Sequence, residues 1–221
     1  MYLSKLLLNP RHSQAQLDLA APYELHRTLG KSFPTAETNR YRSECGVLFR
    51  VEPLIRKEVV VLVQSLAEPD WSALPPGYAL QADGPRDFNP ALKEGQRLRF
   101  RLAANPVMKV REDGKKHSVR FPLIRDRYPE DEEGIGYIDW LDRQATDHGF
   151  SVEAVADVPF RVARRRKRGQ NLDKAEIPHF GVRFDGLLQV TDPEKLMQAV
   201  RNGIGPAKAF GFGLLSLARA E

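Results

Sequence analysis

Strict alternation of apolar and basic residues over positions 96–102 constrains the fold of this chain more than any other feature. The stretch reads QRLRFRL, and successive side chains of an extended strand point to opposite faces of a sheet. One face would carry Leu98, Phe100 and Leu102, and the other would carry Arg97, Arg99 and Arg101. The pattern predicts a strand in a sheet with one buried and one cationic face.

The first ninety residues predict a similar sheet. Residues 2–8 read as a buried strand that the turn dipeptide Asn9-Pro10 ends, and regularly spaced leucines up to Leu29 predict helices, the second beginning near Pro22. The runs 46–52 and 58–66 are rich in β-branched residues and predict two strands, the second of them central. A short strand at 78–81 would complete a βαββαβ unit, although its second helix is barely visible in the sequence.

The second half predicts the same order of elements. After the strand at 96–102 come a polar insertion, a helix around Trp140, two long strand-like runs that flank a basic cluster, a last helix and a final strand. Their expected places are 105–133 for the insertion, Ile135 to Leu141 for the helix, Asp192 to Gly203 for the last helix and 211–217 for the final strand. We therefore predict an α+β chain of two tandem ferredoxin-like (RRM-like) βαββαβ domains, 1–90 and 96–221. The repeat is one of element order and not of sequence.

Charge favours a polyanionic partner, and its distribution says more than its sum. The 221 residues carry a formal charge of +5 with a pI near 9.4, and six of the eight residues at 161–168 are basic. Such clusters are usually solvent-exposed surface charge without a specific partner. The absence of any acidic residue within this one favours nucleic acid, presented on a β-hairpin with Gly169 as its turn.

Several classes of protein are not supported by the sequence. Cys45 is the single cysteine, so an internal disulfide is excluded, and the early Asn9-Pro10 interrupts any signal-peptide core. No run approaches the roughly 18 apolar residues of a membrane span, so we expect a cytoplasmic protein without membrane contact. The four histidines other than His26 lack metal-ligand spacing, and GKS at 30–32 lacks the preceding glycine of a P-loop, so neither metal nor any other cofactor is predicted.

A glycine-rich segment near the end of the chain is one candidate for contact with phosphate. It reads GIGPAKAFGFGLLSL, and its glycines surround Lys208. Glycines let a phosphate chain approach the backbone closely, but they also make tight turns between a helix and a strand. Part of it, KAFGFGLL, resembles the RNP1 pattern of RNA-recognition motifs and departs from it at Ala209, Gly213 and Leu215.

The segment PYELHRTL at 22–29 is the candidate for catalysis. Tyr23 and His26 are three residues apart, so on a helix both would lie on one face and could meet a single phosphodiester. Imidazole titrates near neutrality and can serve as base or acid, whereas a phenol with an ordinary pKa of about 10 is a poor base. Arg27 and Lys31 could neutralise phosphate charge, or could simply line a solvated helix face.

The motifs occur in the order found in one family. LNP at 8–10, PYELHRTL at 22–29, VLVQSLAEPDW at 61–71, RLRFRLAANPVM at 97–108 and the glycine-rich segment all look like the CasE branch of the repeat-associated CRISPR proteins. The chain resembles this family along nearly its whole length, and only the insertion at 111–133 and the end of the first helical region depart from it.

The resemblance implies a metal-independent, sequence-specific endoribonuclease that cleaves the repeat hairpin of precursor CRISPR RNA. Internal attack by a 2′-OH leaves a 2′,3′-cyclic phosphate and a 5′-OH, and the resemblance further implies that the protein stays bound to the guide RNA beside other Cascade subunits. It places the family's catalytic Tyr and His on Tyr23 and His26, of which we assign proton transfer to His26. The alternatives are a non-catalytic module of the same fold that binds an RNA hairpin, and a purely structural subunit.

The residues expected to act form two sets. The expected catalytic set is Tyr23, His26 and Lys31. The expected RNA-binding set is Arg27, Arg161, Arg164, Arg165, Arg166, Lys167, Arg168, Gly203, Gly205, Lys208, Gly211 and Gly213.

Overall fold

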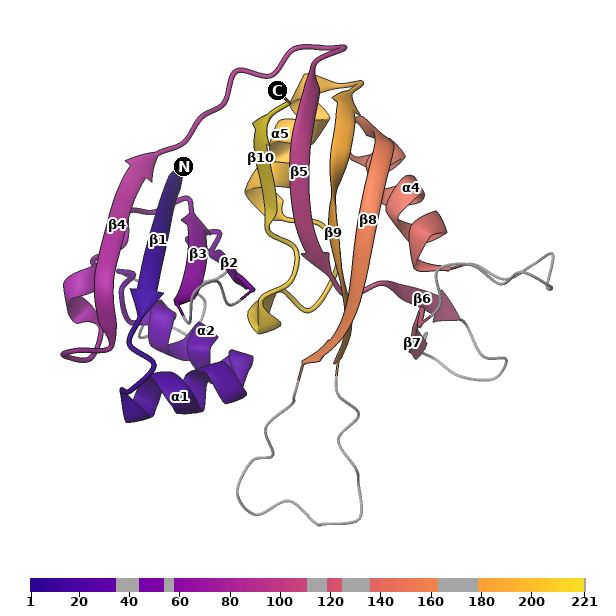
Figure 1. Cartoon of the computed structure of the whole chain (residues 1–221). Helices are drawn as coiled ribbons and strands as arrows, with labels where there is room; N and C mark the ends of the chain where they lie inside the picture. Colours follow the sequence, from indigo (N-terminus) through magenta and orange to yellow (C-terminus); the bar gives the residue numbers. More distant parts are fainter. Residues whose placement is uncertain (35–43, 54–57, 111–118, 125–135, 163–178, 221) are drawn as a thin grey trace.

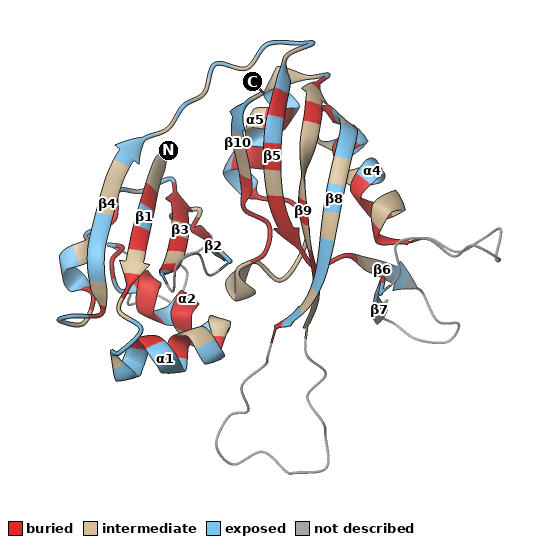
Figure 2. Cartoon of the chain, viewed as in Figure 1, coloured by how far each residue is buried: buried red, intermediate tan, exposed pale blue. Residues whose placement is uncertain are grey.

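Two four-stranded antiparallel sheets stand side by side in the computed structural model (Figure 1). The structure describes residues 1–34, 44–53, 58–110, 119–124, 136–162 and 179–220. Each sheet buries one face under its own helices, as the alternation of buried and exposed positions along the strands shows in Figure 2. The basic residues 164–168 lie outside the described ranges.

The first sheet has the strand order β2-β3-β1-β4, so β3 is internal as predicted. Its elements are β1 (Tyr2–Leu8), α1 (Ser13–Ala20), α2 (Pro22–Gly30), β2 (Leu48–Val51), β3 (Val59–Ser65), the 3-10 helix η2 (Trp71–Ala73) and β4 (Ala79–Asp87). Leu6, Val61 and Val63 alternate toward the helices and are buried with Leu25 and Leu29 of α2. This packing fixes α2 on the sheet and decides which of its faces is left open.

Two expectations for this half were wrong in detail. Between β3 and β4 the chain forms only the short η2 where the second α-helix was expected, because Pro69, Pro75 and Pro76 interrupt helical hydrogen bonding. The final strand, β4, is nine residues long and extends to Asp87, which pairs with Tyr2. Sequence reasoning missed its second part because Gly84-Pro85 looks like a strand-breaking turn.

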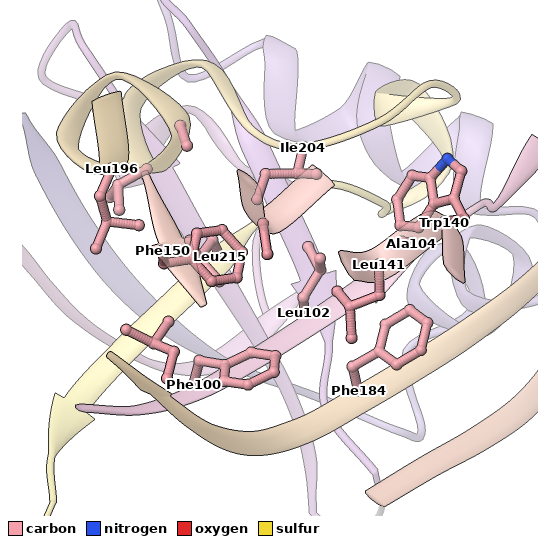
Figure 3. Close-up of a cluster of buried hydrophobic side chains, with 14 of the residues drawn as sticks. Phe100, Leu102, Ala104, Trp140, Leu141, Phe150, Phe184, Leu196, Ile204 and Leu215 are labelled. Carbon is pink, nitrogen blue, oxygen red and sulfur yellow. The ribbon is translucent and has the colours of Figure 1, made fainter. Parts of the chain in front are cut away.

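The second sheet has the order β10-β5-β9-β8. Its half contains β5 (Arg97–Ala104), β6 (Val107–Val110), β7 (Val119–Pro122), α4 (Tyr137–Asp147), β8 (Phe150–Val162), β9 (His179–Val190), α5 (Pro193–Asn202), the 3-10 helix η3 (Lys208–Phe210) and β10 (Leu215–Arg219). Leu98, Phe100 and Leu102 are buried as predicted, and Figure 3 shows Phe100 and Leu102 within one cluster with Trp140, Phe150 and Phe184.

Two further expectations required correction here. No strand was predicted in the polar insertion at 105–133, but it contains the paired strands β6 and β7. The last strand was expected to begin at residue 211, but β10 begins at Leu215. Gly211 and Gly213 adopt φ of 84° and 91°, a left-handed backbone that cannot continue a strand.

The two halves contact each other through the face of the first sheet that its helices leave open. Strand alternation turns Leu48, Arg50 and Gln64 toward the second half, while Phe49 turns toward α2. The amide Nε2 of Gln64, which is buried, donates to the Val200 carbonyl of α5 over 2.6 Å. A buried hydrogen bond of this kind ties the sheet of one half to a helix of the other.

Candidate active site

Helix α2 holds Tyr23 and His26 one turn apart on a single face. Pro22 occupies the first helical turn, where its missing N–H costs nothing, and Leu25 and Leu29 anchor the helix in the core. The two rings are nearly parallel, with centroids 6.2 Å apart and planes at 23°. Tyr23 is 46% exposed and His26 only 7%, so the phenol faces solvent above a largely buried imidazole.

Two phenylalanines complete the surroundings of this pair. The ring centroid of Phe49 in β2 lies 6.2 Å from that of His26, and the ring centroid of Phe210 in η3 lies 5.7 Å from that of Tyr23. Phe49 belongs to the first half and Phe210 to the second. The candidate site is therefore built from both halves, and its geometry depends on how they dock.

His179 extends this aromatic row into the second half. It is the first residue of β9, and its ring centroid lies 4.3 Å from that of Phe210 and 6.5 Å from that of Phe212. Sequence reasoning considered His179 only as a metal ligand and did not select either phenylalanine. The RNP1-like run KAFGFG was the available signal for Phe210 and Phe212, since that motif is defined by its aromatic residues.

The arrangement suits general acid–base chemistry on a phosphodiester. An imidazole beside a solvent-facing hydroxyl can take a proton from one oxygen and return one to another, provided the substrate reaches both. These two residues, predicted from the sequence to act together, are thus brought together by the structure.

The glycine-rich segment has a packing role in the structure. The N–H groups of Gly203, Gly211 and Gly213 donate to the carbonyls of Ala199, Lys208 and Ala103 at 2.8, 3.2 and 2.7 Å. A Cβ on Gly211 would lie 3.2 Å from Phe49, and one on Gly205 would lie 3.1 Å from Trp140. Close approach within the protein therefore accounts for these glycines, and their contact with RNA stays a prediction.

The remaining site candidates are distributed around this centre. Arg27 is exposed and pairs with Glu24 over 3.1 Å, and Lys31 is exposed at the C-cap of α2. Lys208 begins η3, and Arg161 is exposed near the end of β8. The other basic residues of the cluster, Arg164 to Arg168, lie outside the described ranges, so their contribution to the site stays a prediction.

A partly buried ion-pair network lies beside the site, between the two sheets. It consists of Arg50, Glu52, Arg101, Asp185 and Arg183, and it borders a cleft of about 660 Å³. Desolvation lowers the pKa of Arg50 and the pairing with Glu52 opposes it only in part. For Asp185 desolvation acts to raise the pKa, but hydrogen bonds from Arg101 and Arg183 outweigh it and leave the pKa lowered.

Within the residues that the structure describes, no group of three or more His, Cys, Asp or Glu side chains could hold a metal ion. Over the same ranges, no helix is both long enough and apolar enough to span a bilayer.

Comparison with known proteins identifies the family. A family model described as CRISPR associated protein matches residues 1–219. The CRISPR-associated endoribonuclease Cse3 of Thermus thermophilus is 42% identical over 99% of this chain and 100% of its own length. The CRISPR system Cascade subunit CasE of Escherichia coli is 32% identical over 99% of both chains. This chain belongs to the CasE family.

Solved structures of the CasE family confirm the predicted pair of ferredoxin-like domains. Thermus thermophilus Cse3 bound to an RNA representing a pre-cleavage complex covers 98% of each chain with a TM-score of 0.79 at 40% identity. The CRISPR-associated protein Cas6e of Escherichia coli covers the whole of both chains with a TM-score of 0.66 at 28% identity. The fold and the family predicted from the sequence are both confirmed.

Proposed function

We propose that this CasE-family chain is a sequence-specific endoribonuclease that cleaves the repeat hairpin of precursor CRISPR RNA without a metal ion. The observation that carries the proposal is the pairing of Tyr23 with His26 at the junction of the two halves. It occurs in a chain that is 42% identical, along its whole length, to a CRISPR-associated endoribonuclease.

His26 performs the proton transfer in this proposal. A base removes the proton of the ribose 2′-OH, whose oxygen attacks the adjacent phosphorus, and an acid protonates the departing 5′-oxygen. The products are a 2′,3′-cyclic phosphate and a 5′-OH. Tyr23 places the phosphate or stacks on a base, since its exposed ring is available to nucleic acid. Lys31 and Arg27 neutralise phosphate charge from the C-terminal half of α2.

The proposed partners follow from the same relatives. The processed hairpin stays bound, and the protein joins other Cascade subunits in the cytoplasm, as proposed from a relative that is itself a Cascade subunit. The basic residues 161–168 would contact the RNA backbone. A-form RNA has a narrow major groove, so these side chains would enter at a helix end or a distorted pair.

The proposal is tested by incubating the protein with EDTA and a labelled hairpin from the repeat of its own genome. A single cut that leaves a cyclic phosphate is expected, because the nucleophile is supplied by the RNA and the proton transfers by side chains. Product ends are identified by gel mobility before and after phosphatase treatment. Tight binding with no cut would instead support the non-catalytic binding module.

Reversing Arg164, Arg165 and Arg166 to glutamate is expected to weaken hairpin binding by about 10- to 100-fold. Loss of three phosphate contacts should also reduce the slope of log affinity against log salt by roughly 2 units. Fluorescence anisotropy at several salt concentrations measures both. The control replaces Glu130, Asp131 and Glu132 with glutamine, which removes three charges of the opposite sign. An unchanged affinity and slope in the arginine variant would favour the purely structural subunit.

A further inference from the structure

Arg50 is a buried charge in a strand whose neighbours are apolar. It lies in β2 between Phe49 and Val51, and it is only 3% exposed. A buried guanidinium is costly unless its donors are bonded and its charge is paired. The arrangement of its hydrogen bonds therefore indicates what this residue contributes.

The guanidinium spans the boundary between the two halves. Within the first half, Nε and Nη2 donate to Glu52 Oε1 over 2.9 and 2.6 Å. Toward the second half, Nη1 donates to the carbonyl oxygens of Leu214 and Arg101 over 3.0 and 3.2 Å, and Nη2 donates to Ser216 Oγ over 2.9 Å. One planar side chain thus joins β2 to both β5 and the start of β10.

The second half also forms an ion pair with Glu52. Arg101 Nη1 donates to Glu52 Oε2 over 2.6 Å, and Arg101 is itself held by Asp185 of β9. Glu52 therefore accepts from one arginine of each half with its two oxygens. Hydrogen bonds of a guanidinium have fixed directions. The network therefore stabilises one relative position of the two sheets and would be broken by a shift between them.

The network lies directly beside the catalytic pair. Phe49, the residue before Arg50, contacts the ring of His26. A Cβ added to Gly211 would lie 3.2 Å from the ring of Phe49. Leu214, whose carbonyl accepts from Arg50, follows Gly213, and the segment before it carries Phe210, which contacts Tyr23. A shift of the second half relative to β2 would therefore move Phe210 relative to Tyr23 and His26.

We propose that Arg50 is a positioning residue for the RNA cleavage reaction. It fixes the glycine-rich segment of the second half against helix α2 of the first and so sets the geometry of the composite site. The inference rests on the proposed function, because its effect is read in the cleavage rate. It assigns Arg50 no contact with RNA.

The test compares Arg50→Lys with Arg97→Lys in cleavage of the repeat hairpin with RNA in excess, where the retained product limits each active molecule to one cut. Lysine keeps the charge but cannot form the directed bonds to Glu52, Leu214, Arg101 and Ser216 together. A misplacement of about 1 Å can cost on the order of 100-fold in rate, so we expect the rate constant of Arg50→Lys to fall about 10- to 100-fold while its amplitude stays full. Arg97 is the matched control, because its ion pair with Glu153 lies within the second half.

Amplitude and rate separate positioning from folding. A variant that merely unfolds would leave fewer active molecules, each cutting at the normal rate, so a reduced amplitude with an unchanged rate constant would overturn the proposal. An unchanged rate constant at full amplitude would overturn it as well. Failure of the unaltered protein to cut would instead count against the proposed function.

The two tryptophans provide a test that does not depend on activity. Trp71 lies in the first half and Trp140 in the second, and they are the only tryptophans of the sequence. Each single-tryptophan chain, Trp71→Phe or Trp140→Phe, is therefore unfolded in urea and followed by two probes, fluorescence for the half that keeps its tryptophan and far-UV circular dichroism for both halves. We expect coincident midpoints with Arg50 present and separate midpoints after Arg50→Lys. Midpoints that still coincide in the Arg50→Lys chains would overturn the coupling on which the proposal depends.

Discussion

Replacing His26 with alanine is expected to slow cleavage of the repeat hairpin by roughly 10² to 10⁴-fold. The imidazole is the one group in the α2 pair that can exchange a proton readily near neutral pH. It lies 6.2 Å from the Tyr23 ring by centroid and is 7% exposed, so it is held in place by its surroundings on α2. The single-turnover rate constant with saturating protein measures the loss.

Binding of the hairpin should change little in the same variant. Tyr23 remains exposed, and the basic residues 161–168 that we expect to hold the backbone are untouched. The matched control is His148→Ala, because His148 follows α4 in the second half and its ring Nδ1 bonds the Gln144 carbonyl oxygen over 2.7 Å. Cleavage by His26→Ala within about threefold of the unaltered chain would rule out the assigned role, and equal losses in both variants would indicate a general effect of histidine removal.

Replacing Gly203 with alanine is expected to destabilise the protein by about 3 kcal/mol. Gly203 ends α5 with φ 72° and ψ 155°, a conformation that is strained for any residue with a side chain. An added Cβ would lie 2.9 Å from the Gly213 carbonyl oxygen and 2.9 Å from both methyl groups of Leu48 in the first half. Because a backbone oxygen cannot easily move, the glycine-rich segment and the contact between the halves should both be displaced.

Gly95→Ala is the control for backbone strain alone. Gly95 has φ 75°, yet among the described residues other than its chain neighbours no heavy atom lies within 4 Å of the position of an added Cβ. We expect Gly95→Ala to lower the free energy of unfolding by about 1 kcal/mol. The difference between the two variants then gives the effect of the close contacts at Gly203. Urea unfolding gives both free energies. Equal costs would contradict the packing role that the structure gives Gly203.

Much of the fold could be predicted from local sequence. The alternation at 96–102 placed three arginines and three apolar residues on the correct faces of β5. Asp192-Pro193 and Gly203 predicted the limits of α5, where the Asp192 carboxylate does accept from the Glu194 and Lys195 N–H groups. The corrections fell on elements with weak local signals, namely η2 in place of a helix, β6, β7, the end of β4 and the start of β10.

The candidate site could be predicted only in part. Tyr23 and His26 lie on one helical turn, so their spacing alone predicted that they share a face. Phe49, Phe210 and His179 belong to segments far from them along the chain, and no periodic pattern relates such distant positions. Arg50 was missed for the same reason, since a charge in an apolar strand becomes interpretable only when its acceptors are known.

The sequence by itself determined most of the secondary structure, the tandem ferredoxin-like fold and the family, and it placed the candidate residues Tyr23 and His26 together on α2. These depend on interactions among residues close in the chain, where backbone geometry converts spacing into a shared face. The tertiary structure decided that the site is shared between the halves, with Phe210 and the Arg50 network brought to α2. Docking depends on the shapes and hydrogen-bonding groups of two complete surfaces, and these exist only after both sheets have formed.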